Sequence, residues 1–173
     1  MRLIAAVDRA WGLGCENRLL FHIRRDMERF RALTNGQVVV MGKNTLLSLP
    51  GGAPLKNRVN IVFTQKDAPL PAGALGVNGV AALLRLLQTP LCARKIPFVI
   101  GGAAIYELLL PYCAIAYITH VFAGRKADCA LPRLSRLPNW RLAAKSPVYE
   151  EGGLRFLYAA YRNTAFVQEG IVL

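Results

Sequence analysis

The sequence predicts an α/β domain with a largely parallel central sheet, because apolar strand-like runs alternate with helical patterns along the chain. The β-branched run at Gln37–Gly42 is typical of a strand that is buried on both faces. Two strands lead through glycine directly into a helix, at Gly42-Lys43 and at Gly101-Gly102. Ligands of open α/β sheets bind beyond the carboxyl ends of the strands, so we expect the functional site at these junctions.

The first part of the chain contains an expected lid and the most informative helix. A strand at Arg2–Val7 is followed by Asp8–Leu20, which is glycine-bearing and irregular. A loop of this length in a compact domain is often a lid over a site. The helical pattern at Ile23–Leu33 follows it and closes with turn residues at Asn35-Gly36.

The later elements continue the same alternation. We expect a sheet of about eight strands with an antiparallel C-terminal edge and helices on its flanks. The further strands are expected at Arg58–Phe63, Ala74–Val77, Ile96–Ile100, Ala116–Val121, Trp140–Ser146 and Leu154–Tyr161, and the further helices at Lys43–Leu49, at Val80–Leu87 and directly after Gly101-Gly102.

Length and composition indicate one domain with a real core. The chain has 173 residues, 54% of them apolar, and contains no apolar run near the roughly 18 residues of a membrane span. Its first residues do not resemble a signal peptide, so we expect a cytoplasmic location. The four cysteines lack C-x-x-C spacing and lie far from the histidines, which favours free thiols over disulfides or a metal site.

The net charge of +12 predicts an anionic partner without identifying it. Nucleic acid and a phosphorylated small molecule are both candidates. The basic residues are dispersed through the whole chain and form no block of five or six, which argues against a dedicated nucleic-acid arm.

Asp26 is the candidate catalytic residue, because it shares a narrow helical stripe with Phe30 and Leu33. A carboxylate on the inward face of a helix is costly unless it is paired or hydrogen-bonded. In one interpretation Asp26 lies in the first turn and complements the helix dipole. In the other it lines a pocket and meets a polar group of a ligand.

The two glycine junctions are candidate anion sites, since each places free backbone N–H groups at a helix start. Two such sites in one crevice suit a dinucleotide pyrophosphate, and Lys43 and Thr45 strengthen the first of them. Residues 64–66 (Thr64, Gln65 and Lys66) follow a strand end and can receive an extra phosphate, which favours NADP over NAD. An inward carboxylate beside a nicotinamide favours hydride transfer. His22 and His120 have no obvious nucleophile partner, so we expect structural roles for them.

An ordered set of segments resembles the dihydrofolate reductase family. The segments are I-A-A-V-D-R-A-W-G-L-G, F-H-I-R-R-D-M-E-R-F-R, V-V-V-M-G-K-N-T, N-R-V-N-I-V, F-V-I-G-G-A-A-I-Y and Y-I-T-H-V. The resemblance implies a dihydrofolate reductase-like single domain over residues 1–163 and a C-terminal extension over 164–173. It also implies NADPH-dependent reduction of 7,8-dihydrofolate to tetrahydrofolate by a monomer that binds neither nucleic acid nor membrane.

The resemblance assigns roles to individual residues. Asp26 would orient the pterin and promote protonation of its N5, Thr119 would support that carboxylate, and Arg58 would hold the glutamate tail. The catalytic group comprises Asp26, Thr119, Phe21 and Leu19. The substrate pocket comprises Ile4, Ala6, Asp26, Met27, Phe30, Leu49, Leu55, Arg58, Ile100 and Thr119. The NADPH site comprises Ala6, Leu13, Gly14, Gly42, Lys43, Asn44, Thr45, Thr64, Gln65, Ile100, Gly101, Gly102, Ala103, Ala104, Ile105 and Tyr106, with Gly101-Gly102 expected as a cis pair.

The chain departs from the family pattern at several of these positions. Leu19-Leu20-Phe21 replaces the usual Leu-Pro-Trp, which removes an indole donor and a stiff lid residue. Ala104 stands where many relatives have a basic residue, and Arg24 where proline is common. Asp128 matches an acidic residue that contacts the lid in some relatives.

Two other functions fit parts of the sequence. A pyrimidine or pteridine reductase of the same fold is one alternative, because a fold does not fix a function. A basic nucleic-acid-binding domain is the other. Asp26 together with Arg58 favours a folate, since the arginine has an obvious use only with a glutamate tail.

Overall fold

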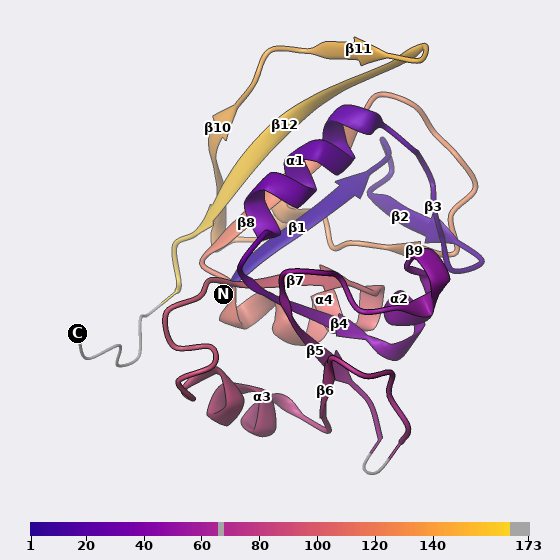
Figure 1. Ribbon diagram of the computed structural model, residues 1–173. Helices are drawn as coiled ribbons and strands as arrows, with labels where there is room; N and C mark the ends of the chain where they lie inside the picture. Colours follow the sequence, from indigo (N-terminus) through magenta and orange to yellow (C-terminus); the bar gives the residue numbers. More distant parts are fainter. Residues whose placement is uncertain (66–67, 167–173) are drawn as a thin grey trace.

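A central mixed sheet organises the molecule, and the computed structural model describes it within residues 1–65 and 68–166. Eight strands of this described part follow the order β10-β12-β8-β1-β7-β4-β5-β6, and β11 pairs with β12 outside that path (Figure 1). The strands are β1 (Arg2–Val7), β4 (Val38–Gly42), β5 (Val59–Phe63), β6 (Ala74–Val77), β7 (Pro97–Gly101), β8 (Ile115–Val121), β10 (Trp140–Lys145), β11 (Tyr149–Glu151) and β12 (Leu154–Asn163).

The expected parallel sheet with an antiparallel C-terminal edge is confirmed. Strands β8, β1, β7, β4, β5 and β6 pair in parallel, whereas β12 is antiparallel to β8, β10 and β11. Parallel neighbours need crossover connections, and the helices supply them. They are α1 (Arg24–Thr34), α2 (Lys43–Ser48), α3 (Val80–Leu87) and α4 (Ala103–Leu109), with 3₁₀ turns at Pro50–Gly52, Leu110–Tyr112 and Leu134–Arg136.

The two faces of the sheet carry separate apolar clusters, as the alternation of side chains along a strand requires. Val38 and Val40 belong to the main cluster, which includes α3 and α4 residues such as Leu83 and Leu109. The intervening Val39 and Met41 pack with residues of α2 and the loop after it on the other face. Helix α1 lies across β1, β8 and β12 (Figure 1).

The expectation that Asp8–Leu20 is irregular throughout is wrong. This segment contains β2 (Gly12–Cys15) and β3 (Arg18–Leu19), which form a small antiparallel sheet with β9 (Cys129–Ala130). The lid is therefore a hairpin that pairs with a distant loop. Strand β11 is a second unexpected element, because it lies between the expected strands Trp140–Ser146 and Leu154–Tyr161.

The structure also bears on the cysteines, the helices and the C-terminal residues. Cys15, Cys92, Cys113 and Cys129 are free thiols, as predicted. No helix in the described part of the chain combines the length and apolarity needed to cross a bilayer. Of the predicted C-terminal extension, the described residues 164–166 begin with Thr164, whose N–H donates to Asn139 O at 2.7 Å, and residues 167–173 lie outside the described part.

Candidate active site

The candidate site lies along the edge of the sheet where the parallel strands end. Ala6 near the end of β1 is in register with Thr119 of β8, and Met41 near the end of β4 is in register with Gly101 of β7. Since all these strands run in one direction, their carboxyl ends bring both glycine junctions and the predicted Thr119 to one edge.

Asp26 points from α1 onto this edge. Thr119 Oγ1 donates a 2.5 Å hydrogen bond to Asp26 Oδ1, and Thr119 itself is buried. Asp26 is half-buried, in agreement with the expected inward stripe. A hydroxyl donor satisfies one carboxylate oxygen, which leaves the second oxygen to accept hydrogen bonds from a ligand.

The start of α1 is stabilised by a different carboxylate, which argues against the interpretation that Asp26 only complements the helix dipole. Glu151 of β11 accepts hydrogen bonds from the backbone N–H groups of Arg24 at 2.6 Å and Arg25 at 3.3 Å. Such bonds satisfy donors that a helix start leaves unpaired. Asp26 also lies in the first turn, but its side chain is engaged by Thr119.

Burial dominates the electrostatics around Asp26. It raises the pKa of the Asp26 carboxyl, while the hydrogen bond from Thr119 and the charge of Arg29 oppose the shift. Burial likewise raises the pKa of the Tyr106 hydroxyl, so that group stays neutral. Tyr106 Oη donates to Ile4 O at 2.7 Å and fixes α4 against β1. The carboxyl therefore lies near neutral hydroxyls and the positive charge of Arg29.

The two glycine junctions lie against each other, and a side chain at Gly42 would be crowded. A Cβ atom on Gly42 would lie 3.1 Å from Ile105 Cγ1, and one on either Gly101 or Gly102 would lie 3.4 Å from Thr45 Oγ1. Gly101 also has a φ of 126°, which favours glycine, and the Gly101-Gly102 peptide is cis as the resemblance implies. These bare backbone turns at two helix starts fit the diphosphate of a dinucleotide.

The lid hairpin is held by two carboxylates at its ends. Asp8 Oδ1 accepts hydrogen bonds from Ala10 N and Gly12 N, each at 2.8 Å. Asp128 Oδ2 accepts one from Glu16 N at 2.6 Å, which matches the contact expected of this residue. The lid tip and α2 enclose a hollow of about 340 Å³ lined by Glu16, Asn17, Arg18, Asn44, Leu47 and Ser48.

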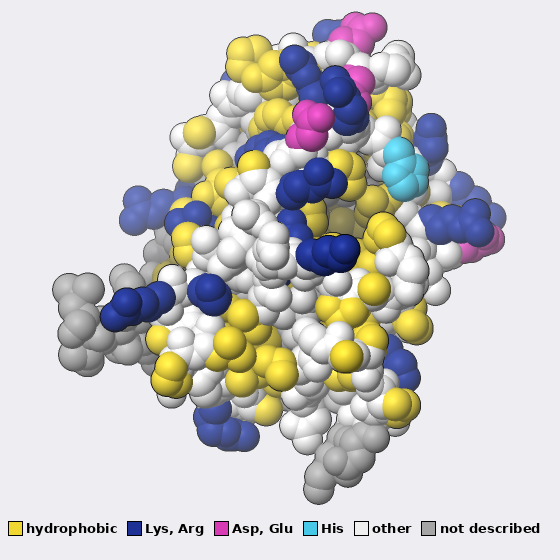
Figure 2. Space-filling model, in the orientation of Figure 1, with side chains coloured by type: hydrophobic (Ala, Val, Ile, Leu, Met, Phe, Trp, Pro, Cys, Tyr) yellow, Lys and Arg dark blue, Asp and Glu magenta, His cyan; other side chains and the backbone are white. Residues whose placement is uncertain are grey.

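Three of the predicted apolar pocket residues pack together on one face of the sheet. Leu49, Leu55 and Ile100 pack on one cluster with the buried Met41. Figure 2 shows a hollow between α1 and the α2 region, with hydrophobic side chains on its floor and Lys and Arg side chains at its rim. Ile4 is buried, Ala6 and Phe30 are half-buried, and Met27 is 37% exposed. The mixed burial of this set is typical of a cleft wall.

Arg58 is held at the edge of this wall by its neighbours. Its Nε donates to Thr34 Oγ1 at 2.9 Å, its Nη1 donates to Lys56 O at 2.8 Å, and its Cζ lies 5.9 Å from the centre of the Phe30 ring. These contacts preorganise the guanidinium, whose remaining N–H groups can meet a carboxylate.

The remaining predicted site residues differ in how far they are buried. Phe21 is buried in a cluster with Leu20 and Ile23, and Arg125 covers its ring at 5.0 Å, whereas Leu19 is 52% exposed on β3. Among the predicted NADPH residues, Lys43, Asn44, Gln65 and Ala104 are exposed, Leu13, Thr64, Ala103 and Ile105 are half-buried, and Gly14 is buried. Lys66 lies outside the described residues.

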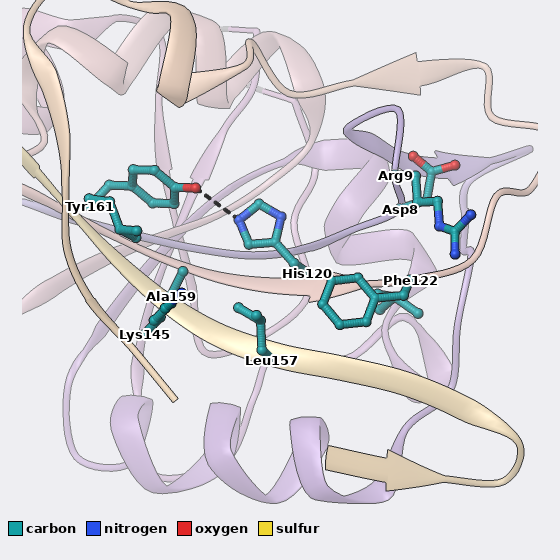
Figure 3. A pocket seen from close by; sticks show the side chains of 10 residues that line it. Asp8, Arg9, His120, Phe122, Lys145, Leu157, Ala159 and Tyr161 are labelled. Carbon is teal, nitrogen blue, oxygen red and sulfur yellow. Dashed lines mark hydrogen bonds between the residues drawn. The ribbon is translucent and has the colours of Figure 1, made fainter. Parts of the chain in front are cut away.

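A second pocket, of about 330 Å³, occupies the opposite face of the sheet (Figure 3). His120 follows Thr119 on β8 and therefore points away from Asp26. His120 Nε2 lies 3.1 Å from Tyr161 Oη, and the Trp11 ring packs edge-on against the imidazole at 5.0 Å. Burial lowers the pKa of His120. The sequence reasoning missed this pocket, and its inner side chains are already paired with one another.

Comparison with known proteins gives a consistent result. A family model described as "Dihydrofolate reductase" matches residues 1–163. Dihydrofolate reductase type 9 of Escherichia coli is 29% identical over 98% of this chain and 96% of the relative. A dihydrofolate reductase of Neisseria meningitidis serogroup B is 33% identical over 92% of this chain and 95% of the relative. A solved dihydrofolate reductase of Enterococcus faecalis, complexed with NADP(H) and RAB-propyl, has a TM-score of 0.81 and 25% identity, and covers 94% of this chain and 95% of that one.

Proposed function

The chain belongs to the dihydrofolate reductase family and reduces dihydrofolate with NADPH, and we propose that Asp26 orients the pterin for this reaction. The single observation that carries the proposal is the geometry of Asp26. One oxygen is engaged by Thr119, and the group lies half-buried at the sheet edge beside the two glycine junctions. A carboxylate with one oxygen left over suits paired N–H donors of a flat heterocycle.

The bottom of the cleft supports this orientation. We propose that the apolar side chains Ile4, Phe30, Leu49, Leu55 and Ile100 contact the pterin and benzoyl rings, and that Arg58 binds the carboxylate of the glutamate tail. Ala6 and Met27 complete the wall. The apolar walls exclude water, which strengthens the interaction between Asp26 and the pterin N–H groups.

The glycine junctions would hold the cofactor on the other side of the substrate. We propose that Gly42–Thr45 and Gly101–Tyr106 bind NADPH, with the exposed Lys43 and Gln65 near its phosphates and the lid residues Leu13 and Gly14 over it. Bound NADPH supplies the hydride. Reduction of the pterin C=N bond also consumes one proton, which is added to N5. Asp26 promotes this protonation because its negative charge raises the basicity of the pterin.

The proposal also includes the oligomeric state and the cellular location of the protein. A monomer suffices, since one chain contains Asp26, Thr119 and both glycine junctions. Four free thiols suit the reducing cytoplasm.

Oxidation of NADPH with dihydrofolate tests the role of Asp26. The variant Asp26→Asn should lose about 100-fold or more of its turnover at neutral pH while binding NADPH as the wild type does. Glu28→Gln is the matched control, because Glu28 lies on the same helix, is 58% exposed and, among the described residues, pairs only with Arg24 at 3.7 Å. Wild-type turnover in Asp26→Asn, or an equal loss in Glu28→Gln, would contradict the proposal.

A further inference from the structure

Arg29 occupies an unusual position between α1 and the sheet. Its Cζ lies 4.4 Å from the centre of the Tyr158 ring and 5.4 Å from that of the Tyr117 ring. Tyr158 belongs to β12 and Tyr117 to β8, so the guanidinium packs onto two adjacent strands. Arg29 follows Asp26 by three residues, a spacing that places both side chains on the same side of the helix.

The charge of Arg29 has no direct counterion in the part of the chain that the structure describes. Within residues 1–65 and 68–166, no carboxylate lies within 4.0 Å of it, and Arg24–Glu28 is the ion pair that does form. Arg29 Nη1 is also buried without a hydrogen-bond partner in this described part. Because arginine stays protonated in proteins, the structure holds a cation that aromatic faces stabilise but do not neutralise.

Asp26 is the acidic group on which this cation acts. The groups around the carboxyl come from four elements: Arg29 on α1, Thr119 and Tyr117 on β8, Tyr158 on β12, and Tyr106 on α4. Of these, Arg29 alone carries a positive charge. The attraction opposes the effect of burial on the pKa of Asp26.

We propose that Arg29 is a positioning residue for the reaction, whose half-buried cation, held between Tyr117 and Tyr158, favours the ionised form of Asp26. The inference rests on the proposed function, because it concerns the charge that orients the pterin. Arg29 acts through Asp26 and need not touch the substrate. Without it, the half-buried carboxyl stays protonated to higher pH, and a protonated carboxyl accepts the pterin N–H groups more weakly.

A direct titration of Asp26 tests this role without turnover. The protein is labelled with carbon-13 at aspartate carboxyl carbons, and the Asp26 signal is assigned by its disappearance in Asp26→Asn. In Arg29→Met the midpoint of the Asp26 titration should rise by about one pH unit relative to the wild type. Arg29→Gln, which is polar and better able to keep the fold, should show a rise of the same sign.

Two further variants separate the local cation from other effects. Arg25→Met removes the same charge from the same helix, but Arg25 stacks on Tyr149 at 5.1 Å and is not among the groups that shift the pKa of Asp26. The titration of Asp26 in Arg25→Met should match that in the wild type. Arg29→Lys retains the cation and should restore most of the wild-type midpoint. As the pH is lowered, turnover falls because Asp26 becomes protonated. The pH at which half of the turnover is lost should move upward in Arg29→Met and Arg29→Gln only.

The outcomes are distinguishable from those of the preceding proposal. An unchanged midpoint in both neutral variants, or an equal rise in Arg25→Met, would overturn the role of Arg29 even if Asp26→Asn is inactive. Conversely, full turnover in Asp26→Asn would overturn the role of Asp26 while leaving the titration result intact.

Discussion

Thr119 and Asp26 share a hydrogen bond of 2.5 Å between Oγ1 and Oδ1 although they are 93 residues apart in the chain. The bond joins the start of α1 to the end of β8. It lowers the pKa of Asp26 against the effect of burial. Thr119 is itself buried, so its hydroxyl has little access to water as an alternative partner.

We therefore expect Thr119→Val to weaken substrate binding and catalysis together. A hydrogen bond to a charged group contributes about 1.5–3 kcal/mol, so kcat/KM for dihydrofolate should fall about 10- to 100-fold. Thr119→Ser keeps the hydroxyl and should retain most activity. Steady-state kinetics of both variants provides the measurement, and equal activity in the two would mean that the hydroxyl is dispensable.

The raised pKa of Asp26 predicts a conflict between function and stability. The ordinary pKa is 3.8. Between that value and the raised folded value, the native state binds more protons than the unfolded state. The free energy of unfolding therefore falls as the pH rises through this window, and the loss persists at higher pH.

Asp26→Asn removes this penalty, so the ligand-free variant should be more stable than the wild type at neutral pH. The Tm should rise by roughly 2–4 °C for each kcal/mol recovered, and the difference should shrink as the pH falls from the raised folded pKa of Asp26 towards the ordinary value of 3.8. Thermal unfolding of both proteins over a pH series measures it. A difference that does not change with pH would show that the charge is not its cause.

Arg58 should distinguish folate from other pterins. Its guanidinium is fixed by Thr34 and Lys56, and a lysine cannot reproduce the planar fork. In Arg58→Lys we expect KM for dihydrofolate to rise about tenfold or more, with no change for a dihydropterin that lacks the glutamate tail. The two substrates are compared in the same assay. Equal effects on both would mean that Arg58 does not bind the glutamate tail.

The sequence predicted the sheet well because most of its strands are apolar runs of at least four residues. The run at Gln37–Gly42 became β4, and the helix expected at Val80–Leu87 has those bounds as α3. The prediction that Asp26 lies on the inward face of its helix was also correct. Strands β3 and β9, with two residues each, were missed because such short segments carry no alternation pattern.

The partners of Asp26 depend on contacts that one segment cannot reveal. Thr119 could be assigned only through the family resemblance. Arg29 follows Asp26 on the same side of α1, but an arginine in a helix is normally read as solvent-exposed. Its burial depends on Tyr117 and Tyr158, which arrive from two later strands, and the sequence alone gives no register between them. Glu151 as the partner of the α1 start depends in the same way on β11.

The tip of the lid should be controlled by the hydrogen bond from the Glu16 backbone to Asp128. The backbone N–H of Glu16 donates to Oδ2 at 2.6 Å, and this bond is the main reason why the pKa of the Asp128 carboxyl is lowered. A lowered folded pKa means that the stabilisation is complete above the ordinary value of 3.8 and is lost as the pH falls through the folded pKa.

Asp128→Ala removes the acceptor and should release the tip of the β2–β3 hairpin while leaving the Asp8 contacts at its base. At neutral pH the amide of Glu16 should exchange with solvent about tenfold faster than in the wild type, whereas the Gly12 amide, held by Asp8 at 2.8 Å, should be unchanged. Asp128→Asn, which retains a neutral acceptor, should lie between them. In the proposal the lid covers the cofactor site. The affinity for NADPH should therefore fall from the wild type to Asp128→Asn and fall further in Asp128→Ala. Wild-type protection of Glu16 in Asp128→Ala would mean that the pairing of β2 with β9 holds the lid by itself.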